Sequence, residues 1–447
     1  MSTLTRRHFL QGLAAGAAAM GLPACAPGSK QIEPATPRPA KPILVVINLD
    51  GGNDWLNMLP PTGGANRRAY DAARPTLGIP AGTLVDLGGG LGLNPDFTGM
   101  GLLAQRGRIA WIPGVGVLGA EPNLSHFVST DFWGRGSFKA VGSGWLGRYA
   151  DKAFQATDVL RAVTVTGDLP VMLRGEARSF VSITGSRGFV FPTRLDGGTL
   201  RDPWSPTLLE AGFDAAVSNP TAGGPAGETA AALVGKAFLT ATHDFGTNGN
   251  LDARTPSVYY PGDTGYPVRS TDGGALNGWL SYQLKLIAQM IANRVGAPAE
   301  GGQVFFCRLG GWDTHANQAI VHANLQRELG GALSAFYQDL ASIQTADGNA
   351  QERTMILGWS EFGRRVPQNS NGTDHGTAGL SFCMGRGVKG GVYGPYPDLG
   401  TLDNGNMIAT VDFRDIYATV LERWLGVGAT DTDALLGDHA YQRLGFL

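Results

Sequence analysis

Ile43-Leu44-Val45-Val46-Ile47-Asn48-Leu49 is a nearly continuous apolar run rich in β-branched residues, and it ends at Asp50-Gly51-Gly52-Asn53-Asp54. Such a run is typical of a strand that is buried on both faces of a parallel sheet. Open α/β sheets bind ligands at the carboxyl ends of their strands, and this run has a carboxylate and two glycines there. The stretch therefore predicts a central strand with Asp50 at the ligand-binding edge.

Further strands and helices are predicted to alternate along the chain. Strands are expected at 108–115 (RIAWIPGV), 304–309 (VFFCRL) and 354–358 (TMILG). Helices are expected at 277–294 and 322–342, where apolar residues recur three and four positions apart. This alternation predicts an α/β fold with a doubly wound, mostly parallel sheet flanked by helices.

Between about 151 and 272 the pattern degrades into Gly, Pro, Thr and Asp with short apolar pieces. We expect an irregular insertion or cap there, within a single α/β domain that spans residues 43–447. Residues 28–42 precede this domain and are rich in proline, which predicts an extended tether.

The composition excludes several classes of protein. Of 447 residues, 43% are hydrophobic, enough for a sizeable core, and the formal net charge is only −2. No broad basic surface is therefore expected for nucleic acid or an anionic membrane. Three cysteines cannot form a disulfide framework, and Cys307 and Cys383 lie in apolar runs, which predicts packed rather than reactive thiols.

The N-terminus predicts export. Residues 1–27 have a basic pair, an uncharged run of small and apolar residues and a small-residue end. Arg6 and Arg7 lie in TRRHFL, which resembles the twin-arginine signal, so we expect the twin-arginine export machinery as a partner. The apolar run is too short and too rich in Gly and Ala to cross a bilayer. The predicted location is the periplasm or the extracellular space.

Two cleavage patterns compete at the end of this signal. Ala24-Cys25-Ala26 fits a small-x-small cleavage site, although Pro27 would then follow the cut. Leu22-Pro23-Ala24-Cys25 resembles a lipoprotein box with an atypical proline. Both alternatives stay open, with a lipid-anchored Cys25 preferred, and membrane contact is expected only through the signal or this anchor.

Polar clusters follow the predicted strands or begin helices, and together they predict one metal site. Ser125, in NLSHF, could cap a helix or act as a nucleophile, because helix N-terminal amides stabilise an incoming anion. Asp313 and His315, in GGWDTH, can both address one cation. The remaining clusters, at 360–365 (SEFGRR) and 372–376 (GTDHG), contain Glu361, Asp374 and His375.

The histidines support a common site. Three of the six histidines after the signal, His126, His315 and His375, lie inside these clusters, whereas His243, His322 and His439 lie outside them. This distribution favours a bound divalent metal. Mixed Asp, Glu and His ligands fit Zn, Mn or Fe and leave Ca open.

With these residues in hand, the sequence resembles the DUF1501 family of mostly bacterial exported proteins, which looks related to the alkaline phosphatase and sulfatase superfamily. The likeness covers nearly all of the chain after the signal. The motifs that carry it are LVVINLDGGND at 44–54, ARPTLGI at 73–79, NLSHFVSTDFW at 123–133, GWLGRY at 144–149, RLGGWDTHANQ at 308–318, SEFGRR at 360–365, GTDHGTAG at 372–379 and VKGGVYGPYPDL at 388–399.

The resemblance implies an alkaline phosphatase-like fold and a role for each clustered residue. Asp50 looks like the first-strand metal carboxylate, and Ser125 looks like the helix-capping nucleophile. Asp313 and His315 resemble the pair that binds the other metal, and Glu361 falls on a strand end where the superfamily places Asp or Asn. His375 corresponds to the late metal-binding histidine, with Asp374 beside it. In an alternative register, Asp374 and His375 form the superfamily's Asp-His pair.

The chain also departs from the superfamily pattern. Asp313 and His315 are closer in sequence than the usual pair, so one of them could point away from the metal. Phe362 and Gly363 stand where a second histidine is expected, which weakens a two-zinc site. The Cys-x-Pro-x-Arg context of sulfatases is absent, so a sulfatase is the less favoured ester hydrolase.

Three classes of function follow from these observations. The first is an exported metal-dependent hydrolase of phosphate or sulfate esters of a small molecule or polymer, with Ser125 as nucleophile and Arg364, or else Arg365 or Arg148, clamping an oxygen. The second is a non-catalytic envelope protein that keeps the fold and a structural metal. The third is a polysaccharide- or protein-binding surface component, which exposed aromatics among Trp55, Trp133, Trp145 and Tyr259-Tyr260 would favour.

Overall fold

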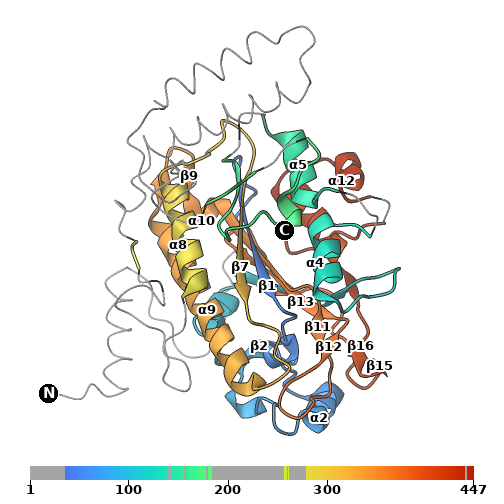
Figure 1. Ribbon diagram of the computed structural model, residues 1–447. Helices are drawn as coiled ribbons and strands as arrows, with labels where there is room; N and C mark the ends of the chain where they lie inside the picture. The colour runs from blue at the N-terminus through green and yellow to red at the C-terminus, as the bar shows by residue number, and fades with distance from the viewer. Residues whose placement is uncertain are drawn as a thin grey trace, which may run out of the picture.

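A nine-stranded sheet forms the centre of the protein (Figure 1). The computed structural model describes residues 36–138, 142–155, 158, 160–177, 180–183, 256–258, 260, 278–437 and 440–447. The signal with Arg6 and Arg7, Cys25, most of the tether, most of the predicted insertion, His243 and His439 lie outside the described residues.

The first strand lies in the middle of the sheet, as its sequence predicts. β1 (Ile43–Asp50) runs parallel to β7 (Gln303–Gly310) on one side and parallel to β10 (Thr354–Trp359) on the other. The strands predicted at 304–309 and 354–358 are therefore confirmed, and both are direct neighbours of β1. The carboxyl ends of all three strands meet at one edge of the sheet.

The rest of the sheet extends to both sides of these strands. β13 (Gly379–Gly385) is antiparallel to β10 and to β4 (Ile109–Gly116), and β4 is parallel to β14 (Gly391–Val392) and β17 (Val411–Asp412). The mostly parallel α/β class is confirmed, with β13 reversed relative to its neighbours.

On the other side of β7, the short strands β5 (Ala162–Thr164) and β6 (Val181–Ser182) continue the sheet in parallel. They fall within the range where the sequence predicts an irregular insertion. Strands of two or three residues are too short to show a period of two in the sequence.

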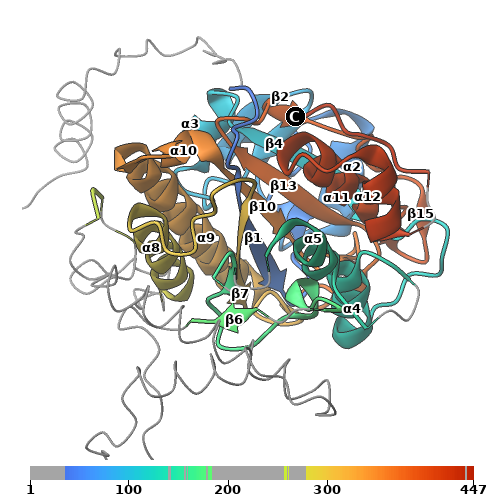
Figure 2. The same cartoon turned by 90° about the horizontal axis from the view of Figure 1, so that it is seen from above.

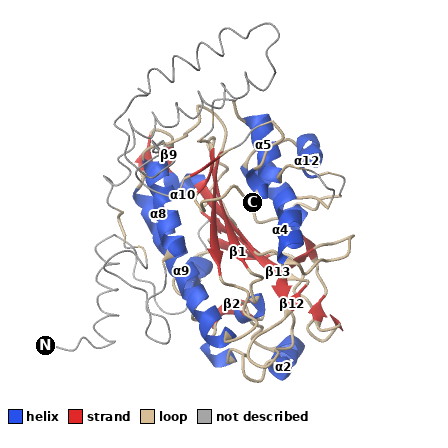
Figure 3. Cartoon of the chain, viewed as in Figure 1, coloured by secondary structure: helices blue, strands red, loops and turns tan. Residues whose placement is uncertain are grey.

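The alternation of side chains along β1 divides the core into two. Ile43, Val45 and Ile47 pack in one cluster with α3 (Met100–Gln105), α8 (Trp279–Ala292) and α9 (Gln318–Ser342). Leu44 and Val46 pack on the opposite face with α4 (His126–Arg135), α5 (Trp145–Ala153), α11 (Phe413–Thr419) and α12 (Ala429–Leu436). Figures 2 and 3 show these two helical layers on either side of the sheet.

Shorter elements complete the described chain. They are η1 (Trp55–Asn57), α2 (Gly64–Ala73), η2 (Ala81–Thr83), β2 (Val85–Gly88), β3 (Leu91–Leu93), η3 (Val171–Leu173), β8 (Gln344–Thr345), β9 (Gly348–Asn349), α10 (Ala350–Arg353), β11 (Gly363–Arg364), β12 (His375–Gly376), β15 (Leu402–Asp403), β16 (Asn406–Met407) and the π-helix η5 (Val420–Trp424). Among the described residues, the structure has no helix both long and apolar enough to span a bilayer.

The two predicted helices are present with shifted ends. α9 begins at Gln318, four residues before the predicted start at His322. Ile320 and Val321 in this first turn are exposed, so the apolar period that marks the helix does not extend to its beginning. Cys307 and Cys383 are free and buried, and burial raises the pKa of both thiols, which confirms them as packed groups.

The Asn53-Asp54 end of the motif after β1 has a structural role. Asp54 is buried and accepts hydrogen bonds at 2.6 and 2.8 Å from the two terminal nitrogens of Arg74. Asn53 Oδ1 lies 3.0 Å from Nε2 of the buried His322, and the amide of Gln326 lies 2.9 Å from His322 Nδ1. An amide donor at Nδ1 and an acceptor at Nε2 suit the neutral ring with its proton on Nε2.

We expect His322 to make the fold acid-sensitive. Burial lowers the pKa of His322 to about 4, whereas an unfolded histidine titrates near 6.5. Between these values the unfolded chain binds one more proton, so stability falls as the pH is lowered, by on the order of 3 kcal/mol at pH 4. Urea denaturation of wild type and His322→Gln at pH 7 and pH 4.5 measures this contribution. An equal loss of stability in both proteins would contradict the expectation.

Candidate metal centre

A candidate metal centre lies at the carboxyl edge of the sheet, on the face covered by α4. His126 begins α4, Asp313 follows β7, and His375 begins β12. One ligand atom from each of these three residues lies within 4.8 Å of the other two. Residues almost 250 positions apart in the chain thus converge on one point.

The hairpin of β11 and β12 brings His375 to this point. Arg364 pairs with His375, and Gly363 pairs with Gly376, in an antiparallel register. The hairpin follows β10 directly, so the carboxyl end of that strand determines the position of the hairpin and of His375. His375 Nε2 lies 3.0 Å from Asp313 Oδ1 as a result.

His126 is oriented by a buried carboxylate. Its Nδ1 lies 2.8 Å from Oε1 of Glu361, and the same oxygen accepts a hydrogen bond of 2.8 Å from the backbone N–H of Gly51. The hydrogen bond to Glu361 raises the pKa of His126. Since this oxygen accepts from Gly51, the proton between the two side chains belongs on Nδ1 of His126, and a neutral ring then turns the lone pair of Nε2 towards Asp313 Oδ2, 3.6 Å away.

His375 is oriented in the same way by a backbone carbonyl. Its Nδ1 lies 2.9 Å from the carbonyl oxygen of Leu124, so Nδ1 carries the proton. Burial lowers the pKa of His375, which favours the neutral ring. The lone pair of Nε2 then faces Asp313 Oδ1 at 3.0 Å and His315 Nε2 at 3.0 Å.

This arrangement fits a cation. With neutral rings, two imidazole lone pairs and a carboxylate face one another at close range, which is repulsive unless a positive charge lies between them. Two imidazoles and a carboxylate, with a carboxylate and a carbonyl holding the far ring nitrogens, form a donor set suited to a divalent transition metal. The fit is better for Zn, Mn or Fe than for Ca, which prefers oxygen ligands.

Arg364 is buried and holds the segments around the site together through hydrogen bonds. Its Nε donates to the Gly52 carbonyl at 2.7 Å, its Nη1 to the Thr373 carbonyl at 2.8 Å, and its Nη2 to Asp313 Oδ1 at 2.7 Å. Burial alone raises the pKa of Asp313, but the hydrogen bond from Arg364 and the close contact with His375 outweigh it and lower the pKa to about 2. The guanidinium thus keeps Asp313 ionised and in place.

The other arginines considered as oxygen clamps lie differently. Arg148 donates to the carbonyls of Leu435, Ser143 and Arg135, and so connects α4, α5 and α12. Arg365 is half-buried, and its Nε has no hydrogen-bond partner among the described residues.

The remaining predicted ligands lie around the three central residues. His315 is partly exposed, with Nε2 at 3.1 Å from Asp313 Oδ1 and Nδ1 at 3.5 Å from Asp374 Oδ1. Asp374 is thus connected to the centre through His315. Asp50 is half-buried, and burial, together with the charge of Glu361, raises its pKa.

Ser125 is exposed at the N-cap of α4, between Leu124 and His126. Its side chain makes no capping hydrogen bond, and its backbone N–H donates to Asn123 Oδ1 at 2.8 Å. Of its two neighbours in the sequence, Leu124 contacts His375 through its carbonyl oxygen, and His126 is itself part of the centre. The hydroxyl itself is left free of the capping role that the sequence allows.

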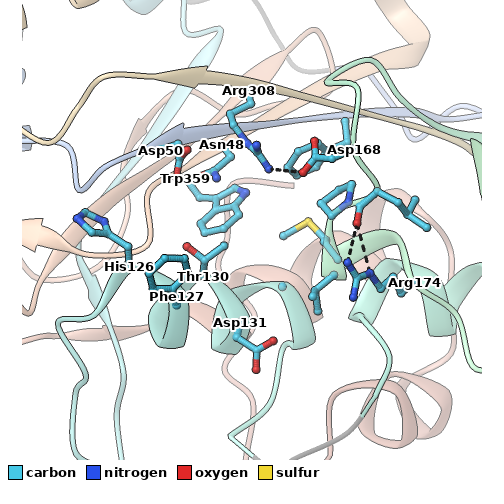
Figure 4. Close-up of a pocket in the computed structure, with 16 residues that line it drawn as sticks. Asn48, Asp50, His126, Phe127, Thr130, Asp131, Asp168, Arg174, Arg308 and Trp359 are labelled. Atoms are coloured by element: carbon cyan, nitrogen blue, oxygen red, sulfur yellow. Dashed lines mark hydrogen bonds and ion pairs between the residues drawn. The ribbon is translucent and has the colours of Figure 1, made fainter. Parts of the chain in front are cut away.

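A pocket of about 300 Å³ adjoins the centre (Figure 4). It shares His126 with the centre, is also lined by Asp50, and extends along α4 towards the residues after β5. Ser125 does not line it. The aromatics that could have marked a separate binding surface, Trp55, Trp133, Trp145 and Tyr260, are all buried, and Tyr259 lies outside the described residues.

His126 is the ligand candidate that sequence reasoning placed in a cluster without assigning it to the metal. The available signal was its position directly after the capping Ser125, together with the grouping of three histidines in the polar clusters. Its role depends on the contact with Glu361, 235 positions away, which spacing in the sequence does not show.

The fold and site define an α/β protein with a candidate metal centre at its sheet edge. Residues 285–439 match the family described as "Protein of unknown function (DUF1501)", so the resemblance found in the sequence is confirmed over this part of the chain. Residues 3–23 match the twin-arginine translocation signal, which supports export to the periplasm or beyond.

Further comparisons give a distant likeness. The chain is similar to the phosphonate monoester hydrolase SpPMH from Silicibacter pomeroyi, with 10% identity and a TM-score of 0.30, over 90% of this chain and 77% of that one. No curated protein matches the sequence.

We expect Arg364→Met to destabilise the protein by about 3 kcal/mol or more, because it leaves several buried carbonyls without donors. Arg365→Met is the matched control, since the neighbouring side chain makes far fewer contacts. Urea denaturation at pH 7 compares the two variants with wild type. Equal losses of stability in the two variants would contradict the supporting role of Arg364.

Proposed function

We propose that the protein is an exported metal-dependent hydrolase of phosphate or sulfate esters. The observation that carries the proposal is the convergence of acceptor atoms from His126, Asp313 and His375 at the sheet edge, with both far ring nitrogens held by acceptors. Such a set is satisfied by a divalent ion, which when bound would polarise an ester oxygen and lower the pKa of a nearby hydroxyl.

In this proposal His126 joins the ligands predicted from the sequence. Asp313 and His375 complete the first set, and Glu361 positions His126 rather than competing with it. Asp50 and His315 flank the set and are our candidates for a second ion, with Asp374 orienting His315. Arg364 holds Asp313 and the loop after β1, and is a positioning residue.

Ser125 is the candidate nucleophile. Its hydroxyl is exposed at the start of a ten-residue helix, and the N-terminal amides of that helix favour an anionic oxygen nearby. Attack by Ser125 on phosphorus would form a serine ester as the alcohol leaves with a proton, and water would then release the phosphate. Sulfate esters would react in the same sense.

Partial exposure favours this enzyme over a non-catalytic envelope protein with a structural ion. The Asp313 side chain is 46% exposed, whereas structural metal sites are closed by protein ligands on all sides. We also propose that Cys25 carries a lipid anchor. Mass spectrometry of detergent-extracted mature protein would detect the acyl chains, and an unmodified N-terminus after Cys25 would remove the anchor.

We expect purified wild-type protein to contain a divalent metal, and His126→Ala and His375→Ala to lose most of it because each removes a ligand nitrogen. Elemental analysis by plasma mass spectrometry, covering Zn, Mn, Fe and Ca, measures the content. His322→Gln, which changes a buried histidine outside the centre, should retain the metal. Metal-free wild-type protein would refute the proposal, as would undiminished metal in both alanine variants.

We expect Ser125→Ala to lower kcat for p-nitrophenyl phosphate, bis(p-nitrophenyl) phosphate or p-nitrophenyl sulfate by about 10³-fold or more, because the nucleophile is lost. Ser129→Ala, one turn later on α4, is the matched control and should remain active. Metal content measured in parallel separates loss of the nucleophile from loss of the ion. Unchanged hydrolysis by Ser125→Ala would exclude this serine as the nucleophile.

A further inference from the structure

Polar groups replace apolar ones at the carboxyl ends of the three central strands. On the face covered by α4, side chains at matched registers of β1, β7 and β10 form rows across the sheet. Two rows are apolar and the row nearest the metal centre is polar: Leu44, Val304 and Met355, then Val46, Phe306 and Leu357, then Asn48, Arg308 and Trp359.

The polar row leaves buried hydrogen-bonding atoms without partners. Asn48 and Trp359 are each 1% exposed, yet Asn48 Oδ1 and Trp359 Nε1 have no hydrogen-bond partner among the described residues, and neither has Arg308 Nε. A buried polar group without a partner is unfavourable, because it loses its hydrogen bonds to water and gains none in the protein. All three residues line the pocket beside the metal centre, where Figure 4 shows them side by side between Asp50 and Asp168.

The opposite walls of this pocket are largely apolar. α4 contributes Phe127, which is 89% exposed, together with Thr130 and Asp131. The residues after β5 contribute an apolar segment at 169–172 (LPVM). A ligand in the pocket would therefore meet hydrogen-bonding groups on the sheet side, and apolar surface together with Asp131 and Arg174 on the other sides.

The charges in the pocket argue against a ligand that carries an anionic group there, in addition to the phosphate or sulfate ester at the metal centre. The lining has three carboxylates, Asp50, Asp131 and Asp168, and two guanidinium groups, Arg174 and Arg308. Arg308 Nη2 lies 3.2 Å from Asp168 Oδ2, so its charge is already compensated. Hydroxyl groups, which both donate and accept, match this mixture of free donors and carboxylates better than an anion does.

We propose that the pocket binds a neutral polyhydroxylated ring, a sugar or a cyclic polyol, and that this ring is the alcohol portion of the ester. The second clause rests on the proposed function, whereas the first rests on the pocket alone. Hydroxyl groups accept from Trp359 Nε1 and Arg308 Nε and donate to Asn48 Oδ1, and the apolar faces of the ring pack on Phe127. A volume of about 300 Å³ is at the small end for ligand pockets, which suits a single ring.

Calorimetric titration with methyl α-D-glucoside, methyl α-D-galactoside, methyl α-D-mannoside, N-acetylglucosamine and myo-inositol tests the pocket directly. At least one of these should bind wild-type protein, and Trp359→Phe, which keeps a ring but removes the N–H, should weaken binding at least tenfold. Trp133→Phe is the matched control, because Trp133 stacks on Trp359 at 5.1 Å but does not line the pocket.

A second pair of variants avoids the buried core. Phe127→Ala should weaken binding of the same compound, while Leu102→Ala, another exposed apolar residue away from the pocket, should not. Both variants should unfold at the wild-type urea concentration, because the side chains are exposed.

The outcomes separate this inference from the proposed function. Hydrolysis of aryl esters without binding of any of the five compounds would overturn the pocket assignment and leave the hydrolase. Binding of inorganic phosphate that depends on Arg308, in place of the neutral compounds, would also overturn it. Binding of a sugar that Trp359→Phe weakens, in a protein without any ester hydrolysis, would support the pocket and remove the hydrolase.

Discussion

The site depends on the hydrogen bonds that the buried guanidinium of Arg364 donates. It donates to backbone carbonyls of Gly51, Gly52, Trp312 and Thr373, and so ties together the segments that follow β1 and β7 and precede β12. The backbone must approach closely for this to happen: Gly51 has a φ of +125°, and a Cβ there would lie 2.4 Å from the backbone nitrogen of Asp313. The position of the metal-ligand candidates follows from this packing of backbone against backbone.

Alternation along parallel strands explains why the candidate chemistry lies on one face of the sheet. The side chains that precede Asn48 and Asp50 on the same face of β1 are Leu44 and Val46, which belong to the core under α4 and α5. The polar ends of the strands therefore emerge beside the first turn of α4, where His126 lies. Metal centre and pocket share His126, and Asp50 lines the pocket beside it, because both occupy the end of this one face.

The sequence predicts the parts of this arrangement that depend on local pattern. The apolar runs locate β1, β7 and β10, and strand ends predict that Asp313, His315 and His375 lie together. The polar row of Asn48, Arg308 and Trp359 was not predicted, because it depends on the register between strands more than 250 positions apart. The reversed direction of β13 and the short edge strands depend on tertiary contacts in the same way.

The order of the strands along the chain has a consequence for biogenesis. β1 stands first in the domain, but its two neighbours, β7 and β10, begin at residues 303 and 354. The central strand therefore cannot pair with β7 and β10 until most of the polypeptide has been synthesised. Pairings between such distant segments form slowly. The export signal is made long before these pairings can form, so the growing chain carries its signal while the central sheet is still incomplete.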